Sequence, residues 1–235
     1  ELLVCGGREP PELDHLADGT PSISHRALHP TMLVGELVAA DPVIGDPRHM
    51  VVNGGLLWLA DHAGDPYLHV IDLTSGKLLI SRGRHGEGPG DFGQMPELSV
   101  RPGDLTGVWA YDYLLRRMTH EDTGLVEKYT VLPTSDGQVA RIWSDAWIDR
   151  THLVGVGDLD TNRLIYSDTA GHLVRLVRST LLGPDSASRE ARRNASSAYV
   201  FCVAPGAHRM AMLFMYGGRI DIHSDDGKVI ARAKT

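Results

Sequence analysis

The chain has 235 residues, of which 42% are apolar and 23% are charged, a composition that is typical of a globular protein and excludes a disordered one. The formal net charge of −7 disfavours general binding to nucleic acid or to acidic membranes, because both carry negative charge themselves. No apolar run approaches the roughly 20 residues of a transmembrane helix. The 26 glycines and 13 prolines indicate many turns.

The first 30 residues are predicted to form a leader or tether. Cys5 follows Leu2-Leu3-Val4 and precedes two glycines and a stretch rich in proline and acidic residues. This order is similar to the end of a bacterial lipoprotein signal, in which Cys5 would carry the lipid, although Val4 stands where such signals have a small residue. An ordinary loop is the alternative. Because the chain begins with Glu1, we expect the true N-terminus to lie upstream.

Four strand-like hairpins recur along the chain at intervals of roughly 50 residues. In each of them a polar turn ends in glycine, with a strand-like run on either side. A tight hairpin needs one residue at positive φ, which glycine adopts without steric cost, and the Asp, Ser or Thr before it can hydrogen-bond the turn. The sequence therefore predicts hairpins that turn at Gly76, Gly124, Gly171 and Gly227.

Two further strand-like runs precede each hairpin, so each repeat holds four short strands. Four antiparallel strands at this period are typical of a β-propeller blade, and no helical pattern alternates with them. We predict an all-β chain in which residues 31–235 form a propeller domain. Its expected blades cover roughly residues 48–92, 96–134, 139–183 and 197–235.

A glycine-rich run follows the first predicted hairpin, and a proline and an apolar strand-like run come after it. The run resembles the link between consecutive blades in the NHL-repeat and TolB-like propellers of bacteria. Its matching residues are Gly83, Gly86, Gly88, Pro89, Gly90 and Phe92. A phosphate-binding loop is disfavoured, because such a loop needs a following helix and here proline and a strand follow.

The resemblance implies six blades, whereas the repeat accounts for four. We therefore expect the chain to be part of a longer six-bladed protein, and a complete four-bladed ring is the alternative. Propeller hydrolases and lyases of the gluconolactonase or amidating-lyase type hold a metal at the central channel through Glu, Asn, Asp or His ligands. Four residues lie at equivalent strand ends and would be candidates for such a site, namely Asn53, Asp61, Asp112 and Asp158. Capping of the adjoining turns is the alternative role for these residues.

A binding role is the main functional prediction, because propellers present loops around one rigid face. Trp143 and Trp147 flank Ser144-Asp145 and are candidates for an aromatic pair that faces a ligand, with packing between blades as the alternative. Together with Asp112 and Asp158 they form the predicted ligand-binding set. No Gly-x-Ser-x-Gly elbow and no Ser/His/Asp arrangement is recognised in the sequence. Histidines 120 and 223 precede two of the turn glycines and are expected to cap those turns.

The sequence thus predicts a non-catalytic propeller scaffold that binds a protein, peptide or glycan in the bacterial periplasm or at the cell surface. No cofactor, no metal site, no nucleic-acid partner and no transmembrane span are predicted, and a lipid anchor at Cys5 stays open. The alternative function is a metal-dependent propeller hydrolase or lyase.

Overall fold

The structure of the chain is a computed structural model. It describes residues 14–15, 21–22, 44–124, 128–131, 134–135, 138–139, 141–159, 162–178, 199–204, 208–214 and 219–234. Every regular element in these residues is a β-strand, and none of them forms a helix long and apolar enough to cross a membrane. Cys5 lies outside the described residues.

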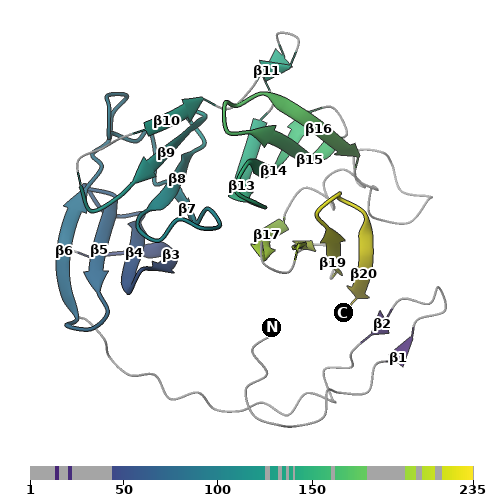
Figure 1. Cartoon of the computed structure of the whole chain (residues 1–235), viewed down its shortest axis with the longest axis horizontal. Coiled ribbons are helices and arrows are strands. Elements are labelled where there is room, and N and C mark those ends of the chain that lie inside the picture. The colour runs from purple at the N-terminus through teal and green to yellow at the C-terminus, as the bar shows by residue number, and fades with distance from the viewer. Residues whose placement is uncertain are drawn as a thin grey trace. The chain divides into compact units, whose positions relative to one another are not determined.

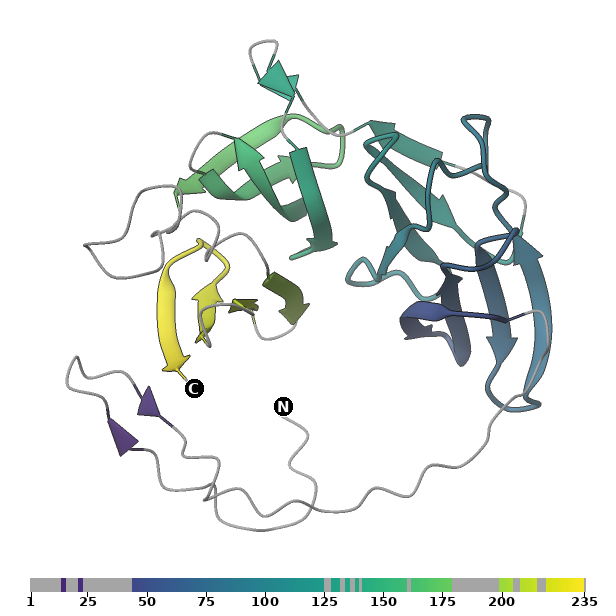
Figure 2. The ribbon, with the colours of Figure 1, turned by 180° about the vertical axis from the view of Figure 1, so that it is seen from behind.

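The chain divides into two compact units, of which residues 35–179 form the larger. Figures 1 and 2 show the strands of this unit from opposite sides. This unit holds three antiparallel four-stranded sheets, in each of which the strands pair in chain order. The first sheet contains β3 (Pro47–Asn53), β4 (Leu56–Asp61), β5 (Leu68–Asp72) and β6 (Lys77–Arg82). The second contains β7 (Glu97–Ser99), β8 (Val108–Asp112), β9 (Arg117–Glu121) and β10 (Lys128–Val131). The third contains β13 (Arg141–Trp147), β14 (His152–Leu159), β15 (Asn162–Asp168) and β16 (Leu173–Arg178).

The smaller unit comprises residues 1–34 and 180–235 and holds a fourth sheet of the same topology. Its strands are β17 (Tyr199–Ala204), β18 (Arg209–Phe214), β19 (Arg219–Ser224) and β20 (Val229–Lys234). Two short pairs complete the described strands, namely β1 (Asp14–His15) with β2 (Pro21–Ser22) and β11 (Thr134–Ser135) with β12 (Gln138–Val139).

Each of the four sheets has the up-and-down order of a propeller blade. In the larger unit the first strand of each blade is innermost, and β7 lies beside both β3 and β13 (Figure 1). This confirms the prediction of an all-β propeller with four-stranded antiparallel blades. Period-2 patterning accounts for this packing in the larger unit, because it gives each sheet a face of apolar side chains that packs against the neighbouring blade.

Two apolar clusters fill the spaces between consecutive blades of the larger unit. The first joins blade β3–β6 to blade β7–β10 around Trp58, Val70, Phe92 and Val108. The second joins blade β7–β10 to blade β13–β16 around Tyr111 and other buried side chains, which include Met118, Ile142, Trp147 and Ile165.

The glycine-rich run forms the link between β6 and β7, as its resemblance implies. Phe92 is fully buried in the first cluster and its backbone pairs with that of Arg84. Gly83 has a φ of +81°, and a Cβ at this position would lie 2.8 Å from the Phe92 ring. Glycine is therefore required at position 83 both by its backbone and by the close approach of the ring. Arg117 of β9 donates hydrogen bonds to the carbonyls of Gly88 and Asp91, which fixes the link against the next blade.

The predicted turn glycines mostly behave as expected. Gly76, Gly171 and Gly227 have φ values of +66°, +82° and +82°, so their predicted left-handed turns are confirmed. Gly124 does not adopt a positive φ, and the prediction is wrong there. Its amide instead donates to the Asp122 carboxylate at 2.6 Å, an Asx-type turn that does not need the left-handed conformation.

The two histidines that were expected to cap turns differ from each other. His223 Nδ1 lies 3.1 Å from the Gly227 carbonyl, so this histidine does contact its turn. His120 instead packs against the ring of Trp109, with the ring centroids 5.0 Å apart, and its Nε2 lies 3.9 Å from the Asp104 carboxylate. The same repeat position thus serves a turn in one blade and a strand face in another.

Candidate functional site

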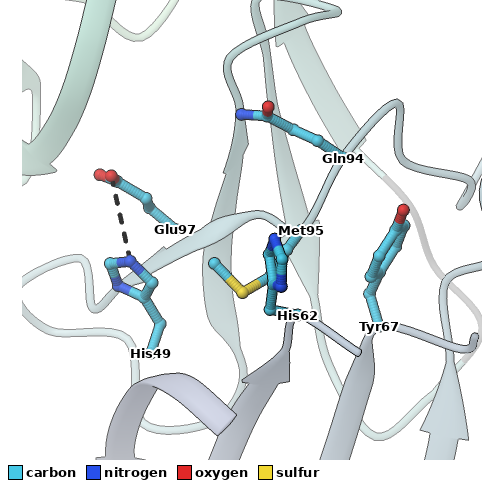
Figure 3. Close-up of a pocket in the computed structure, with 6 residues that line it drawn as sticks. All are labelled: His49, His62, Tyr67, Gln94, Met95 and Glu97. Atoms are coloured by element: carbon cyan, nitrogen blue, oxygen red, sulfur yellow. Dashed lines mark ion pairs between the residues drawn. The ribbon is translucent and has the colours of Figure 1, made fainter. Parts of the chain in front are cut away.

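An open pocket of about 210 Å³ lies between the first two blades of the larger unit (Figure 3). It is found at the end of the sheets where the innermost strands β3 and β7 begin. Its lining comes from these two strands, from the loop between β4 and β5, and from the link that precedes β7. The lining residues are His49, His62, Tyr67, Gln94, Met95 and Glu97.

His49 and Glu97 point toward each other across this pocket from neighbouring blades (Figure 3). His49 Nε2 lies 4.0 Å from Glu97 Oε1, and the two side chains are 36% and 29% exposed. Burial lowers the pKa of His49, because the charged imidazolium is solvated less well there than in water. At neutral pH the imidazole of His49 is therefore neutral, and both side chains are partly exposed to the pocket.

Asp61, at the end of β4, fixes the first blade's side of the pocket. Its fully buried carboxylate accepts hydrogen bonds from the amides of Gly45 at 2.7 Å, Asp46 at 2.8 Å and Ala63 at 3.0 Å. Burial alone would raise the pKa of Asp61, but these amides, together with nearby His69, outweigh it and lower the pKa. One carboxylate thus joins the segment that leads into β3 to the loop that carries His62.

Asp112, at the end of β8, fixes the second blade's side of the pocket in the same way. It is fully buried, and its carboxylate accepts hydrogen bonds from the amides of Gly93 at 2.6 Å and Leu115 at 3.0 Å. Gly93 directly precedes Gln94 of the pocket. The Asp112 side chain therefore positions a wall of the pocket. Its bond to the Leu115 amide agrees with the alternative role for Asp112, the capping of the adjoining turn. Direct contact of Asp112 with a ligand stays a prediction.

Asp145 of β13 is a buried carboxyl group between the second and third blades. It is 5% exposed, and neither of its carboxyl oxygens has a hydrogen-bond partner among the described residues. Burial raises the pKa of Asp145 well above its usual value, and the charge of Glu97 raises it further. Burial and the charge of Glu97 thus both favour the protonated form of Asp145.

Of the other predicted ligand residues, the structure describes the side chain of Trp147 alone. Trp147 is 1% exposed and its ring meets Trp109 edge-on, with the centroids 5.0 Å apart, so it packs between blades. Trp143 lies on β13 and Asp158 on β14. The side chains of these two residues lie outside the described part of the structure. Whether any of the three contacts a ligand stays a prediction.

A Ser/His/Asp constellation that the sequence did not reveal lies inside the first blade. His69 Nδ1 is 2.8 Å from Ser81 Oγ, and His69 Nε2 is 3.7 Å from Asp61 Oδ2. His69 and Asp61 are both fully buried, and the Asp61 carboxylate already accepts three backbone amides. We interpret this constellation as a structural cluster of polar contacts that joins β4, β5 and β6. In the described residues no group of three or more His, Cys, Asp and Glu side chains is placed to hold a metal ion.

Neither a protein-family model nor a curated protein matches the chain. Solved structures do match. A member of the DUF4221 family from Bacteroides vulgatus has a TM-score of 0.56 at 9% identity, over 80% of this chain and 58% of that one. A streptogramin B lyase has a TM-score of 0.50 at 12% identity, over 80% and 54%. A catalytically inactive virginiamycin B lyase from Staphylococcus aureus, solved with quinupristin, has a TM-score of 0.50 at 11% identity, over 78% and 54%.

These likenesses support the β-propeller fold, and at such low identity they show the fold alone. The chain spans a little over half the length of each of these proteins.

Proposed function

We propose that this protein is a propeller scaffold that binds a small ligand, without catalysis, in the pocket between its first two blades. The observation that carries the proposal is the lining of that pocket, in which His49 and Glu97 converge from the innermost strands of different blades. A concave site with a few convergent polar groups on an apolar wall is the usual form of a ligand site.

The rigidity of the walls also supports a binding role. Asp61 and Asp112 hold the backbone on both sides of the pocket through amide hydrogen bonds from buried positions. A site whose groups are already in place loses little conformational freedom when a ligand binds.

The proposal is tested by a fragment screen that uses ligand-observed NMR on the full chain. His62 lines the pocket with a side chain that is 57% exposed, so His62→Trp would fill the mouth of the pocket without disturbing the core. His85 is also exposed but is not part of the lining, so His85→Trp is the matched control. We expect fragments that bind the wild type and the control but not His62→Trp. Fragments that bind all three proteins equally would contradict the proposal.

A lyase is the second candidate function. It is favoured by the neutral imidazole of His49 beside the Glu97 carboxylate, an arrangement suited to moving a proton, and by the structural likeness to streptogramin B lyase. An assay of quinupristin cleavage by the wild type and by His49→Gln tests it. Turnover that the variant loses would favour the lyase over the scaffold.

We also propose a cellular location and a family for the protein. We place the protein in the bacterial periplasm or at the cell surface, anchored through Cys5, because of the lipoprotein-like order of residues around that cysteine. The NHL-repeat or TolB-like assignment with six blades is supported by the link between the first two blades. Metabolic labelling with an alkyne fatty acid, applied to the natural gene product and to Cys5→Ser, tests the anchor.

A further inference from the structure

Four of the six side chains that line the pocket can both donate and accept hydrogen bonds. They are those of His49, His62, Tyr67 and Gln94. None of the four has a side-chain hydrogen bond of normal length to another of the described residues, since His49 Nε2 is 4.0 Å from Glu97 and His62 Nδ1 is 3.5 Å from Asp46. A cleft with several unpaired polar groups selects a ligand that pairs with them and rejects one that leaves them unpaired.

These polar groups reach the pocket from separate segments of the chain (Figure 3). His49 lies on β3, Tyr67 and His62 lie in the loop between β4 and β5, and Gln94 lies in the link before β7. A ligand that meets all of them needs polar groups on several of its sides. A hydroxyl group both donates and accepts, so it matches a phenol, an amide or an imidazole equally well. The lining therefore favours a compound with several hydroxyl groups over one with a single polar head.

The same pocket also has a small apolar wall, which is formed by the Tyr67 ring and the Met95 side chain. Both residues pack against the first apolar cluster and also line the pocket. An aromatic ring with a hydroxyl at its tip can contact the C–H groups of a sugar ring and hydrogen-bond its hydroxyls at the same time. The volume of about 210 Å³ corresponds to roughly seven water molecules at ~30 Å³ each, which suits one sugar unit.

We infer that the ligand of this pocket is a monosaccharide, whose hydroxyl groups hydrogen-bond His49, Tyr67 and Gln94 and whose ring lies against Met95 and the Tyr67 ring. The inference rests on the proposed function, because it names the class of ligand for the same site. It goes beyond the proposal in requiring several hydroxyl groups on one small ring, and it requires no particular charge state or partner of Glu97.

The experiment compares sugars with a ring that lacks their hydroxyl groups. Glucose, galactose, mannose, N-acetylglucosamine, xylose and ribose are each titrated into the isotopically labelled full chain while the amide shifts are followed. Tetrahydropyran-2-methanol, which keeps the ring and the hydroxymethyl group of a hexose but not the ring hydroxyls, is the reference. We expect at least one sugar to bind at the pocket about tenfold more tightly than the reference, because several hydrogen bonds are lost together. This comparison uses the wild type, so it does not depend on how a variant folds.

Two variants assign the effect to individual side chains. Tyr67→Phe removes the phenol oxygen and keeps the ring, and Gln94→Leu removes the amide. We expect each to weaken binding of the sugar about fivefold and to leave binding of tetrahydropyran-2-methanol unchanged. Tyr113 is also half-buried but lies outside the lining, so Tyr113→Phe is the matched control and should bind the sugar as the wild type does.

The outcomes separate the two claims. If tetrahydropyran-2-methanol binds as tightly as the best sugar, or if screened fragments bind at the pocket and no sugar does, the inference is wrong and the ligand-binding function stands. If a sugar binds but neither Tyr67→Phe nor Gln94→Leu weakens its binding, the assigned hydroxyl contacts are wrong. If none of the sugars and none of the screened fragments binds at this pocket, both the inference and the proposed function fail.

Discussion

The two blade interfaces of the larger unit are built differently. The first, between blades β3–β6 and β7–β10, is closed by Phe92 and by an ion pair in which Arg82 Nη2 lies 2.7 Å from Glu121 Oε2. The second, between blades β7–β10 and β13–β16, holds Asp145, whose carboxyl has no hydrogen-bond partner among the described residues. The first interface thus gives the pocket firm walls. The second carries a polar group that costs stability, since an unpaired buried polar group is unfavourable.

The largest effect on stability is expected at Phe92, the buried ring between the first two blades. Phe92→Ala removes a fully buried ring and should lower the free energy of unfolding by about 3–5 kcal/mol, because the cavity cannot collapse between two sheets. Urea denaturation measures it. Leu105, which is 81% exposed, is the control, and Leu105→Ala should change stability by less than about 0.5 kcal/mol. A loss below about 1 kcal/mol for Phe92→Ala would show that the link does not close the interface.

Asp61 should rank next, because it is a buried charge that accepts three amides. Asp61→Ala should cost about 3 kcal/mol, whereas Asp65→Ala, an exposed change in the same loop, should cost little. The pKa of Asp61 is lowered in the folded state, so its stabilisation is present above its ordinary pKa near 4 and is lost as pH falls through the lowered value. Urea denaturation between pH 3 and pH 7 measures both effects. Equal costs for the two variants would contradict the role of Asp61 as the support of the pocket.

Gly83 offers a smaller test of the same interface. Gly83→Ala forces a Cβ against the Phe92 ring and a left-handed backbone onto alanine, at a cost of about 1–3 kcal/mol. Gly55 also has a positive φ, of +77°, but a Cβ there meets nothing within 4 Å. Thermal unfolding of Gly83→Ala and Gly55→Ala therefore separates the backbone strain, which both share, from the contact with Phe92. A cost for Gly83→Ala no greater than that for Gly55→Ala would contradict the close packing.

The smallest effect on stability is expected at Asp145 in the second interface, where the substitution should stabilise the protein instead of destabilising it. The pKa of Asp145 is raised in the folded state, so the unfolded chain loses its proton near pH 4 while the folded chain keeps it. Stability is therefore predicted to fall as pH rises from about 4 toward the raised pKa. Asp145→Asn removes this dependence and should be more stable than the wild type at pH 7. Urea denaturation of the variant and of Asp112→Asn, which should lose stability, measures the contrast. A loss in Asp145→Asn would mean that the carboxylate has a partner.

The blades could be predicted from the sequence because hairpins are local. A turn glycine, the strands beside it and the Phe92 link are each contained in a short run of residues, and Gly76, Gly171 and Gly227 behave as the pattern implies. Gly124 departs from the pattern because the side chain of Asp122 satisfies its turn instead.

The pocket could not be predicted in the same way, because it is assembled from distant segments. His49 and Glu97 belong to different blades and neither lies in a recognisable motif, so only the packing of β3 beside β7 brings them together. The repeat did identify Asp112 as a residue at the correct end of a strand. Its carboxylate, however, accepts a hydrogen bond from the amide of Gly93, next to the pocket residue Gln94. This contact depends on the path of the segment between β6 and β7, which the repeat pattern does not specify.

The central claim is that the first two blades carry the ligand site. Mapping of the amide shifts that bound fragments cause in the labelled full chain tests it most directly. The account predicts that the shifts fall on residues 45–49, 62–67 and 94–97, and that they disappear in His62→Trp. Shifts confined to the region of Trp143, Trp147 and Asp158 would contradict it and would place the site where the sequence pattern alone suggested.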